Sequence, residues 1–344
     1  MIILFSLIVG CSYPGITVYE YDGRQITVNF LDKDSAFEYI QNSNYSERMN
    51  RLNISLRLDE DLNSIDRKYE VKTHEKFIRE NIKDWDGYEK HIVWGALENA
   101  IEKLETFSPA LIPDTLFFIN TSMRLEFNAF FTVNKAICVP SSVVWPLLFG
   151  SLIEKKIAHE LFHIYSRYNE PKRDSLYAIF NFVKADTIIA GKALSTKMIN
   201  NPDVHSNNYV LSLEDISCEL KNLFLVVKLN EPKYNNNRGA ISFLGATNIF
   251  DFFDGHILEL ENIGDNSFRV KDSISVNSYE LAKIKANFDE VCGSLSSDRF
   301  FAEEILAESF TFGYLTLEDS DLLEDCTTQD REKLQRILKI IRGY

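Results

Sequence analysis

The order of apolar and polar positions predicts strands at the start of the chain and helices after them. Residues 16–31 alternate and are rich in β-branched and aromatic side chains, as in one or two short strands. Residues 34–56 and 75–107 carry apolar side chains at the spacing of amphipathic helices, and the second pattern is interrupted near residues 84–87. Residues 59–72 are polar and charged, so we expect a solvated loop there.

The middle of the chain alternates between short strands and one long helix. Residues 115–119 predict a strand, and residues 126–139 predict a strand pair with a turn at 134–136. A helix is expected over residues 151–168, where nothing breaks the pattern. Asn169-Glu170-Pro171 should end or bend it, because proline disfavours helix at the residue before it.

Strands return after residue 211 and helices close the chain. Apolar runs between Asn- and Gly-rich turns, among them residues 240–244, predict a β-rich insertion at about residues 230–290. Residues 299–310 and 327–342 predict helices, the second amphipathic and starting behind threonines that can cap it. We therefore expect an α+β fold with a mixed sheet, a long central helix and C-terminal helices.

Composition and charge limit the kinds of partner. A chain of 344 residues with 45% hydrophobic content can form one large domain or two modest ones. Its formal charge of −14 argues against nucleic acid and anionic membrane surfaces, because both would repel it. After the first residues, no apolar run approaches the roughly 20 residues that a membrane-spanning helix needs.

The first residues predict a signal peptide. Residues 1–9 are apolar, and Ile8-Val9-Gly10-Cys11 resembles a bacterial lipobox. The resemblance implies removal of residues 1–10 and lipidation of Cys11, with the protein anchored by lipid in the bacterial cell envelope, at the outer membrane facing the periplasm or at the cell surface. No Lys or Arg precedes the apolar run, so a buried N-terminal strand is the alternative. The other four cysteines could be free thiols or form two disulfides.

The strongest chemical signal is the H-E-x-x-H pattern formed by His159, Glu160 and His163. On a helix the two histidines lie one turn apart on one face, so both imidazoles can reach one metal ion. Glu160 then leans toward the open side of that ion. This is the arrangement of a zinc hydrolase, in which three protein ligands leave the fourth position to water.

The third zinc ligand must come from elsewhere in the chain. A histidine six residues after the second, as in metzincins, is excluded because that position is Asn169. Glu304 and Glu308 share one face of a predicted helix, so Glu304 can bind the metal while Glu308 orients an imidazole. Glu303 is the alternative ligand, but it has Ala307 four residues on, where Glu304 has a second acid.

A second motif suggests a family. Asn128-Ala129-Phe130-Phe131, about 30 residues before the histidines, resembles the N-A-F-W edge strand of thermolysin-type gluzincins. The resemblance implies that Asn128 and Ala129 border the substrate cleft and bind an extended peptide through their backbone. Gluzincins also use a His or Tyr to stabilise the oxyanion, for which His205 and Tyr209 come first and Tyr177 and Tyr168 after them.

Two further stretches, residues 173–182 and 201–203, resemble uncharacterised bacterial zincin-like lipoproteins. Together these resemblances imply an N-terminal α/β segment at 11–85 and a zincin-like metallopeptidase domain at 86–344. The expected function is zinc-dependent hydrolysis of peptide or protein substrates, with Glu160 taking a proton from the activated water and passing it to the leaving amine. The alternative is a non-catalytic surface-binding lipoprotein on a zincin-like scaffold.

Overall fold

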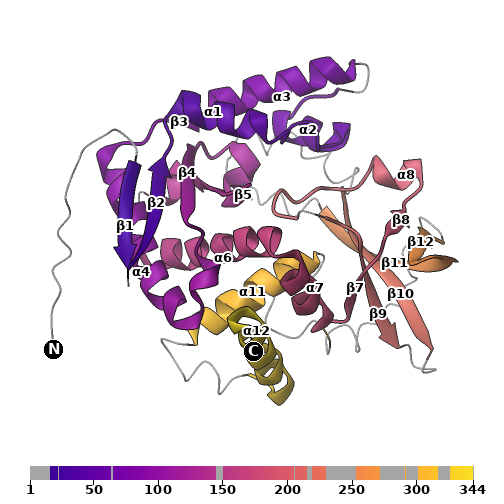
Figure 1. The fold of residues 1–344 in the computed structure, drawn as a ribbon. Helices are drawn as coiled ribbons and strands as arrows, with labels where there is room; N and C mark the ends of the chain where they lie inside the picture. The colour runs from indigo at the N-terminus through magenta and orange to yellow at the C-terminus, as the bar shows by residue number, and fades with distance from the viewer. Residues whose placement is uncertain are drawn as a thin grey trace.

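The computed structural model describes residues 16–21, 23–62, 65–144, 150–204, 206–214, 219–229, 253–271, 291, 301–316 and 326–343. Helices and strands alternate along these residues in an α+β fold, as the sequence predicts (Figure 1). The predicted signal peptide and Cys11 lie outside the described residues. Among the described residues, no helix combines the length and the apolar character that crossing a bilayer requires.

The first sheet is mixed and carries an antiparallel strand at each edge. Its strand order is β1-β2-β4-β6-β5, and β3 pairs with one end of β4. The central strands β2, β4 and β6 are parallel, while β1 and β5 pair antiparallel with their neighbours. The strand bounds are β1 Ile16–Tyr21, β2 Arg24–Phe30, β3 Ile82–Lys83, β4 Thr115–Thr121, β5 Phe131–Val133 and β6 Ala136–Pro140. Strands from both sides of residue 85 therefore share one sheet.

Helices cover both faces of this sheet, because successive side chains of its central strands point in opposite directions. Leu116 and Phe118 of β4 belong to a core shared with α4 (Gly87–Phe107) and α6 (Gly150–Tyr168). Phe117 and Ile119 face a second core shared with the other layer of helices. That layer consists of α1 (Lys33–Asn42), α2 (Arg51–Leu58) and α3 (Arg67–Asn81), drawn along the top of Figure 1.

The helix predictions are confirmed in outline and wrong in one place. The pattern at residues 34–56 forms two helices, α1 and α2, separated by a turn. The expected loop at residues 59–72 is wrong from Arg67 onward, since α3 begins there behind the Asp66 side chain, which accepts from the amide of Lys68 at 2.9 Å. The predicted interruption before α4 is confirmed, and Asp86 opens α4 with a capping box.

A second sheet forms the β-rich part of the molecule. Its strand order is β7-β9-β10-β11-β12-β8, and it encloses a separate apolar core that contains Phe224, Leu258 and Phe268. The strand bounds are β7 Phe182–Lys184, β8 Thr187–Ile189, β9 Tyr209–Glu214, β10 Leu220–Leu229, β11 Phe253–Gly264 and β12 Ser267–Val270. The β-rich part thus begins at Phe182 rather than near residue 230. The strand expected at residues 240–244 lies outside the described residues.

The remaining helices pack around α6. Both C-terminal helices are confirmed, and α11 packs against α6 while α12 packs against α7 and α11. Thr327 caps α12 by accepting from the amide of Asp330 at 3.1 Å. Their bounds are α7 Glu170–Ala178, α11 Ala302–Leu315 and α12 Thr328–Arg342, with short helices α5 at Ser141–Val144 and α8 at Lys192–Ser195 and 3₁₀ turns at Pro109–Leu111 and Leu125–Asn128.

Candidate metal centre

Helix α6 carries the H-E-x-x-H residues on the side that faces α11. Its Ile157, Leu161 and Phe162 are fully buried in the main core, where Phe162 stacks on Phe310 of α11. The helix ends at Tyr168, and α7 starts at Glu170 with a proline in its first turn, as the sequence predicts. Packing of the apolar side therefore fixes the rotation of the helix, and with it the direction of the two histidines.

Glu304, in the first turn of α11, meets both histidines. Its Oε2 lies 3.3 Å from His159 Nε2, and its Oε1 lies 3.6 Å from His163 Nε2. The two Nε2 atoms lie 3.0 Å apart. The three side chains that the sequence selects as zinc ligands are brought together, although 141 positions separate His163 from Glu304.

The spacing of these atoms suits a small tetrahedral cation. With metal–ligand bonds of about 2.0 Å, the ligand atoms of a tetrahedral zinc site lie about 3.3 Å apart. The separations of 3.0, 3.3 and 3.6 Å, the last two measured to different oxygens of the Glu304 carboxylate, lie close to that value. Two imidazoles and one carboxylate are also a donor set that zinc accepts in hydrolytic sites. The residues present therefore fit a zinc ion.

The outward nitrogen of each imidazole has a partner that sets its orientation. His163 Nδ1 lies 3.0 Å from Glu303 Oε1, and His159 Nδ1 lies 3.2 Å from Thr311 Oγ1. Glu303 also accepts from Ser166 of α6 at 2.8 Å and from the Tyr177 hydroxyl. A donated Nδ1–H leaves the Nε2 lone pair of each ring pointing at the proposed ion.

These contacts correct one sequence-based assignment. Glu308 was expected to orient an imidazole, but the two Nδ1 atoms face Glu303 and Thr311. Glu308 is half-buried on the following turn of α11. Glu303, considered as an alternative ligand, instead contacts the Nδ1 atom of His163, on the side of the ring away from Glu304.

The Glu304 carboxylate is fixed from a third direction. Asn201, in the segment between α8 and β9, donates its side-chain amide to Glu304 Oε1 at 2.7 Å. Burial alone would raise the pKa of Glu304, but the imidazoles of His163 and His159 lower that pKa well below its usual range. The carboxylate is therefore held in its charged form, as a metal ligand must be.

Glu160 and Asp203 form a second acidic feature beside the centre. They are 2% and 6% exposed, and together with His163 each offers a ligand atom within 4.8 Å of the others. Glu160 Oε2 is buried and accepts no hydrogen bond from the described residues. Burial, and next the charge of Asp203, raise the pKa of Glu160 well above its usual value. Burial also raises the pKa of Asp203.

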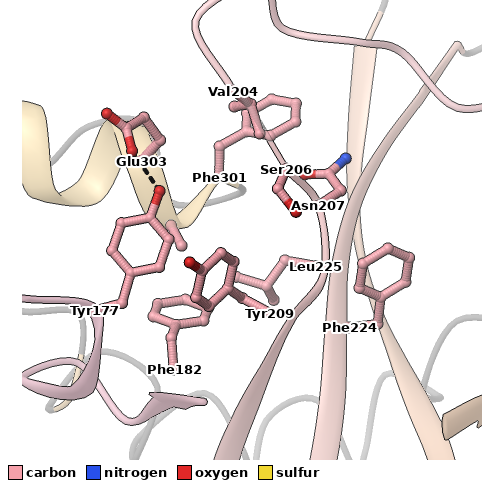
Figure 2. A pocket seen from close by; sticks show the side chains of 11 residues that line it. Tyr177, Phe182, Val204, Ser206, Asn207, Tyr209, Phe224, Leu225, Phe301 and Glu303 are labelled. Atoms are coloured by element: carbon pink, nitrogen blue, oxygen red, sulfur yellow. Dashed lines mark hydrogen bonds between the residues drawn. The ribbon is translucent and has the colours of Figure 1, made fainter. Parts of the chain in front are cut away.

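The tyrosines proposed to stabilise an oxyanion are engaged elsewhere. Tyr209 donates to Asp174 Oδ1 at 2.5 Å and accepts from Arg173 Nε at 3.0 Å, so its proton is directed away from the histidines. Figure 2 shows the Tyr177 hydroxyl pointing at Glu303, in a pocket that both tyrosines line. Tyr168 is 52% exposed at the far end of α6. His205 lies outside the described residues.

The edge strand is present, but it begins later than the sequence indicates. Glu126, Phe127 and Asn128 have φ values of 45°, 56° and 68°, in the left-handed region, so an extended strand cannot pass through them. The turn is held by Arg57, whose Nε and Nη2 each lie 2.5 Å from the buried carboxylate of Glu126. Asn128 and Ala129 therefore precede the edge strand β5, and the side chain of Asn128 accepts from Ser142.

On β5 itself, Asp203 occupies the outward-facing amide. Its Oδ1 accepts from the backbone nitrogen and from the hydroxyl of Thr132, both at 2.6 Å. Arg167 of α6 donates to the same hydroxyl at 2.8 Å and to the backbone carbonyl of Asp203 at 3.4 Å. Residues 201–203 are thus fixed between the edge strand and the histidine helix.

No protein-family model, curated protein or solved structure matches this chain. Sequence reasoning missed the roles of Thr311, Asn201 and Asp203 at the centre. The Asn-Pro-Asp run at 201–203 was visible as a resemblance and could have indicated two of them. Thr311 carries no signal in the sequence, because one hydroxyl on a helix is ordinary.

Proposed function

We propose that this protein is a zinc-dependent peptidase of the gluzincin type, built on a zincin-like domain. The observation that carries the proposal is the convergence of His159, His163 and Glu304 at separations that suit tetrahedral zinc. The mixed sheet with an antiparallel edge strand beside the histidine helix supports the same assignment.

The residues have distinct roles in this proposal. His159, His163 and Glu304 hold the ion, which when bound lowers the pKa of water and polarises a carbonyl group. Glu160 lies one residue along α6 from His159, with a buried carboxylate oxygen that has no partner among the described residues. The Glu160 carboxylate can take a proton from water and deliver it to the leaving amine. The raised pKa of Glu160 makes its carboxylate a stronger base, which favours the first of these transfers.

The proposal is tested with Glu160→Gln. Purified protein should contain about one zinc per chain by elemental analysis. The Glu160→Gln variant should keep the zinc and lose peptide hydrolysis by at least about a hundredfold, the lower range for a general base. Hydrolysis is measured as release of new amines from a mixture of peptides.

His159→Ala is the companion variant, which should lose the metal and the activity together. Two results would contradict the proposal. One is hydrolysis by Glu160→Gln at the wild-type rate, and the other is zinc-loaded protein that cleaves no peptide in a broad library. The second result would favour the alternative of a binding protein on this scaffold.

A further inference from the structure

Two buried carboxylates, Glu160 and Asp203, lie close together beside His163, and no Lys or Arg side chain of the described residues donates to either of them. Glu160 is 2% exposed and Asp203 6% exposed, and oxygens of the two groups lie within 4.8 Å. Asp203 Oδ1 is used by Thr132, but its Oδ2 accepts no hydrogen bond from the part of the chain that the structure describes. Glu160 Oε2 is buried and also accepts no hydrogen bond from the described residues.

Such a pair is costly unless something positive binds to it. A buried carboxylate without a partner loses its hydration, and two like charges at this distance repel each other. Arg167 donates to neither carboxylate, because its guanidinium is bound to Thr132 Oγ1, to the carbonyl of Asn134 and to the carbonyl of Asp203. The free oxygens therefore present a small acidic site that suits a cationic group.

A second metal ion does not fit this site. His163 would have to supply a nitrogen, but its Nδ1 is held by Glu303 and its Nε2 faces Glu304 in the first site. One lone pair cannot bind two ions. An ammonium group needs no nitrogen ligand, and it donates up to three hydrogen bonds, which two carboxylate oxygens can accept.

The position of Asp203 indicates which part of a substrate would carry the ammonium group. Asp203 is fixed to the edge strand through Thr132, and Glu160 lies beside the proposed zinc, so the acidic site lies between the strand and the ion. Glu160 has two oxygens, and one suffices for proton transfer while the other shares the ammonium group with Asp203.

We propose that Glu160 and Asp203 bind an ammonium group of the substrate, so that the preferred peptides carry a free amine beside the bond that is cut. The preference for cleavage beside a free amine rests on the proposed peptidase function, whereas amine binding itself does not. The amine can come from an unblocked N-terminus or from a lysine side chain.

Binding is measured first on the metal-free full-length chain, which does not depend on zinc. The probes are leucine amide, N-acetyl-leucine amide and Nα-acetyl-lysine amide, titrated by calorimetry or NMR. Wild-type protein should bind at least one of the two amines about tenfold more tightly than N-acetyl-leucine amide. Asp203→Asn should reduce this preference to below threefold, because one charge of the pair is removed. Tight leucine amide binding assigns an N-terminal amine, and tight Nα-acetyl-lysine amide binding assigns a lysine side chain.

Glu170→Gln is the matched control, since it removes one negative charge from an exposed residue that pairs with Lys184 and Arg173. It should keep the wild-type preference. Equal binding of all three probes to wild-type protein overturns the inference, as does a preference that Asp203→Asn leaves intact. If Glu160 and Asp203 share a proton instead of binding an amine, all three probes should bind equally.

The zinc-loaded chain then provides the kinetic measurement. Cleavage of leucine anilide is compared with that of N-acetyl-leucine anilide and Nα-acetyl-lysine anilide. The amine chosen in the binding experiment should be favoured at least tenfold in kcat/KM, with most of the effect of Asp203→Asn in KM. Amine binding without any cleavage would contradict the peptidase proposal but not the proposed amine site. Cleavage at equal kcat/KM with and without the free amine would contradict only the amine site.

Discussion

Glu303 and Glu304 are neighbours in the chain and contact different sides of the same histidine. Glu303 approaches His163 Nδ1 at 3.0 Å, while Glu304 faces His163 Nε2 at 3.6 Å. The first turn of α11 can serve both nitrogens because it crosses α6 at the level of this ring. Carboxylates at a helix N-terminus also interact favourably with its dipole, which helps two buried acids to sit side by side.

Glu303→Gln tests the orienting role at the residue scale. A glutamine can still accept from Nδ1–H but carries no charge, so the imidazole becomes a weaker ligand. Zinc affinity should fall about 10- to 100-fold, the usual loss when such a partner is changed. The measurement is competition against a chromophoric chelator.

Glu308→Gln is the comparison, because Glu308 lies on the same helix and its loss of charge is identical. It should change zinc affinity less than threefold. A larger loss for Glu308→Gln than for Glu303→Gln would restore the assignment made from the sequence and contradict the contacts seen here.

At the scale of single elements, α3 shows why a charged segment can be a helix. Its buried side is formed by residues at helical spacing, namely Glu70, His74, Phe77, Ile78 and Asn81. The first two of these residues, Glu70 and His74, are polar, so no apolar stripe marks the beginning of the helix. Ion pairs of Glu70 with Arg51 and Arg67 make this burial possible. One of these partners, Arg51, belongs to α2, so a pattern local to α3 does not reveal it.

The burial of His74 predicts a pH dependence of stability. Burial, and next the charge of Arg57, lower the pKa of His74 to about 3. The unfolded chain binds a proton near pH 6.5, so the stabilising effect of the neutral ring is complete above that pH. It is lost as the pH falls from about 6.5 toward about 3, at up to about 1.4 kcal/mol per pH unit.

His74→Asn removes this titration and keeps a polar atom near Ser46, which lies 3.0 Å from His74 Nδ1. Urea unfolding at pH 7, 6 and 5, with metal-free protein throughout, gives the slope of the free energy of unfolding against pH. The slope should be smaller in the variant, although the variant is less stable at pH 7. Parallel slopes would show that His74 titrates normally.

The late start of β5 shows what local patterns miss. Residues 126–133 alternate acceptably for a strand, yet Glu126 is drawn into a turn by Arg57, 69 positions earlier in the chain. By contrast, α6 and α12 were predicted almost to the residue, because their apolar spacing, caps and proline boundary are local. Local signals thus predicted α6 and α12, whereas a long-range ion pair determines where β5 begins.

At the scale of the whole molecule, the candidate centre connects the α/β layers with the C-terminal helices. His159 and His163 come from α6, which packs on the sheet, and Glu304 comes from α11. The histidine pattern alone predicted two ligands. The third ligand could be predicted from the spacing of acids in a helix. The contacts of Asn201 with Glu304 and of Asp203 with Thr132 depend on how the segment before β9 packs, which local spacing does not give.

Zinc should therefore stabilise the fold as a whole. An ion present at 100 times its dissociation constant adds about 2.7 kcal/mol to the free energy of unfolding if the unfolded chain does not bind it. Adding a chelator to zinc-loaded protein should lower the melting temperature by several degrees. Glu304→Gln should reduce the difference between loaded and stripped protein by at least half, and an unchanged difference would place the ion elsewhere.

The Asp203 carboxylate on Thr132 also affects how molecules of this protein meet one another. An uncovered sheet edge offers unpaired amides to any strand nearby, which promotes association between copies. On β5 that amide is already satisfied by a side chain of the same molecule, at 2.6 Å. Strand exchange at this end of the sheet would have to break a hydrogen bond to a charged acceptor first, so the edge closest to the histidines is shielded from self-association.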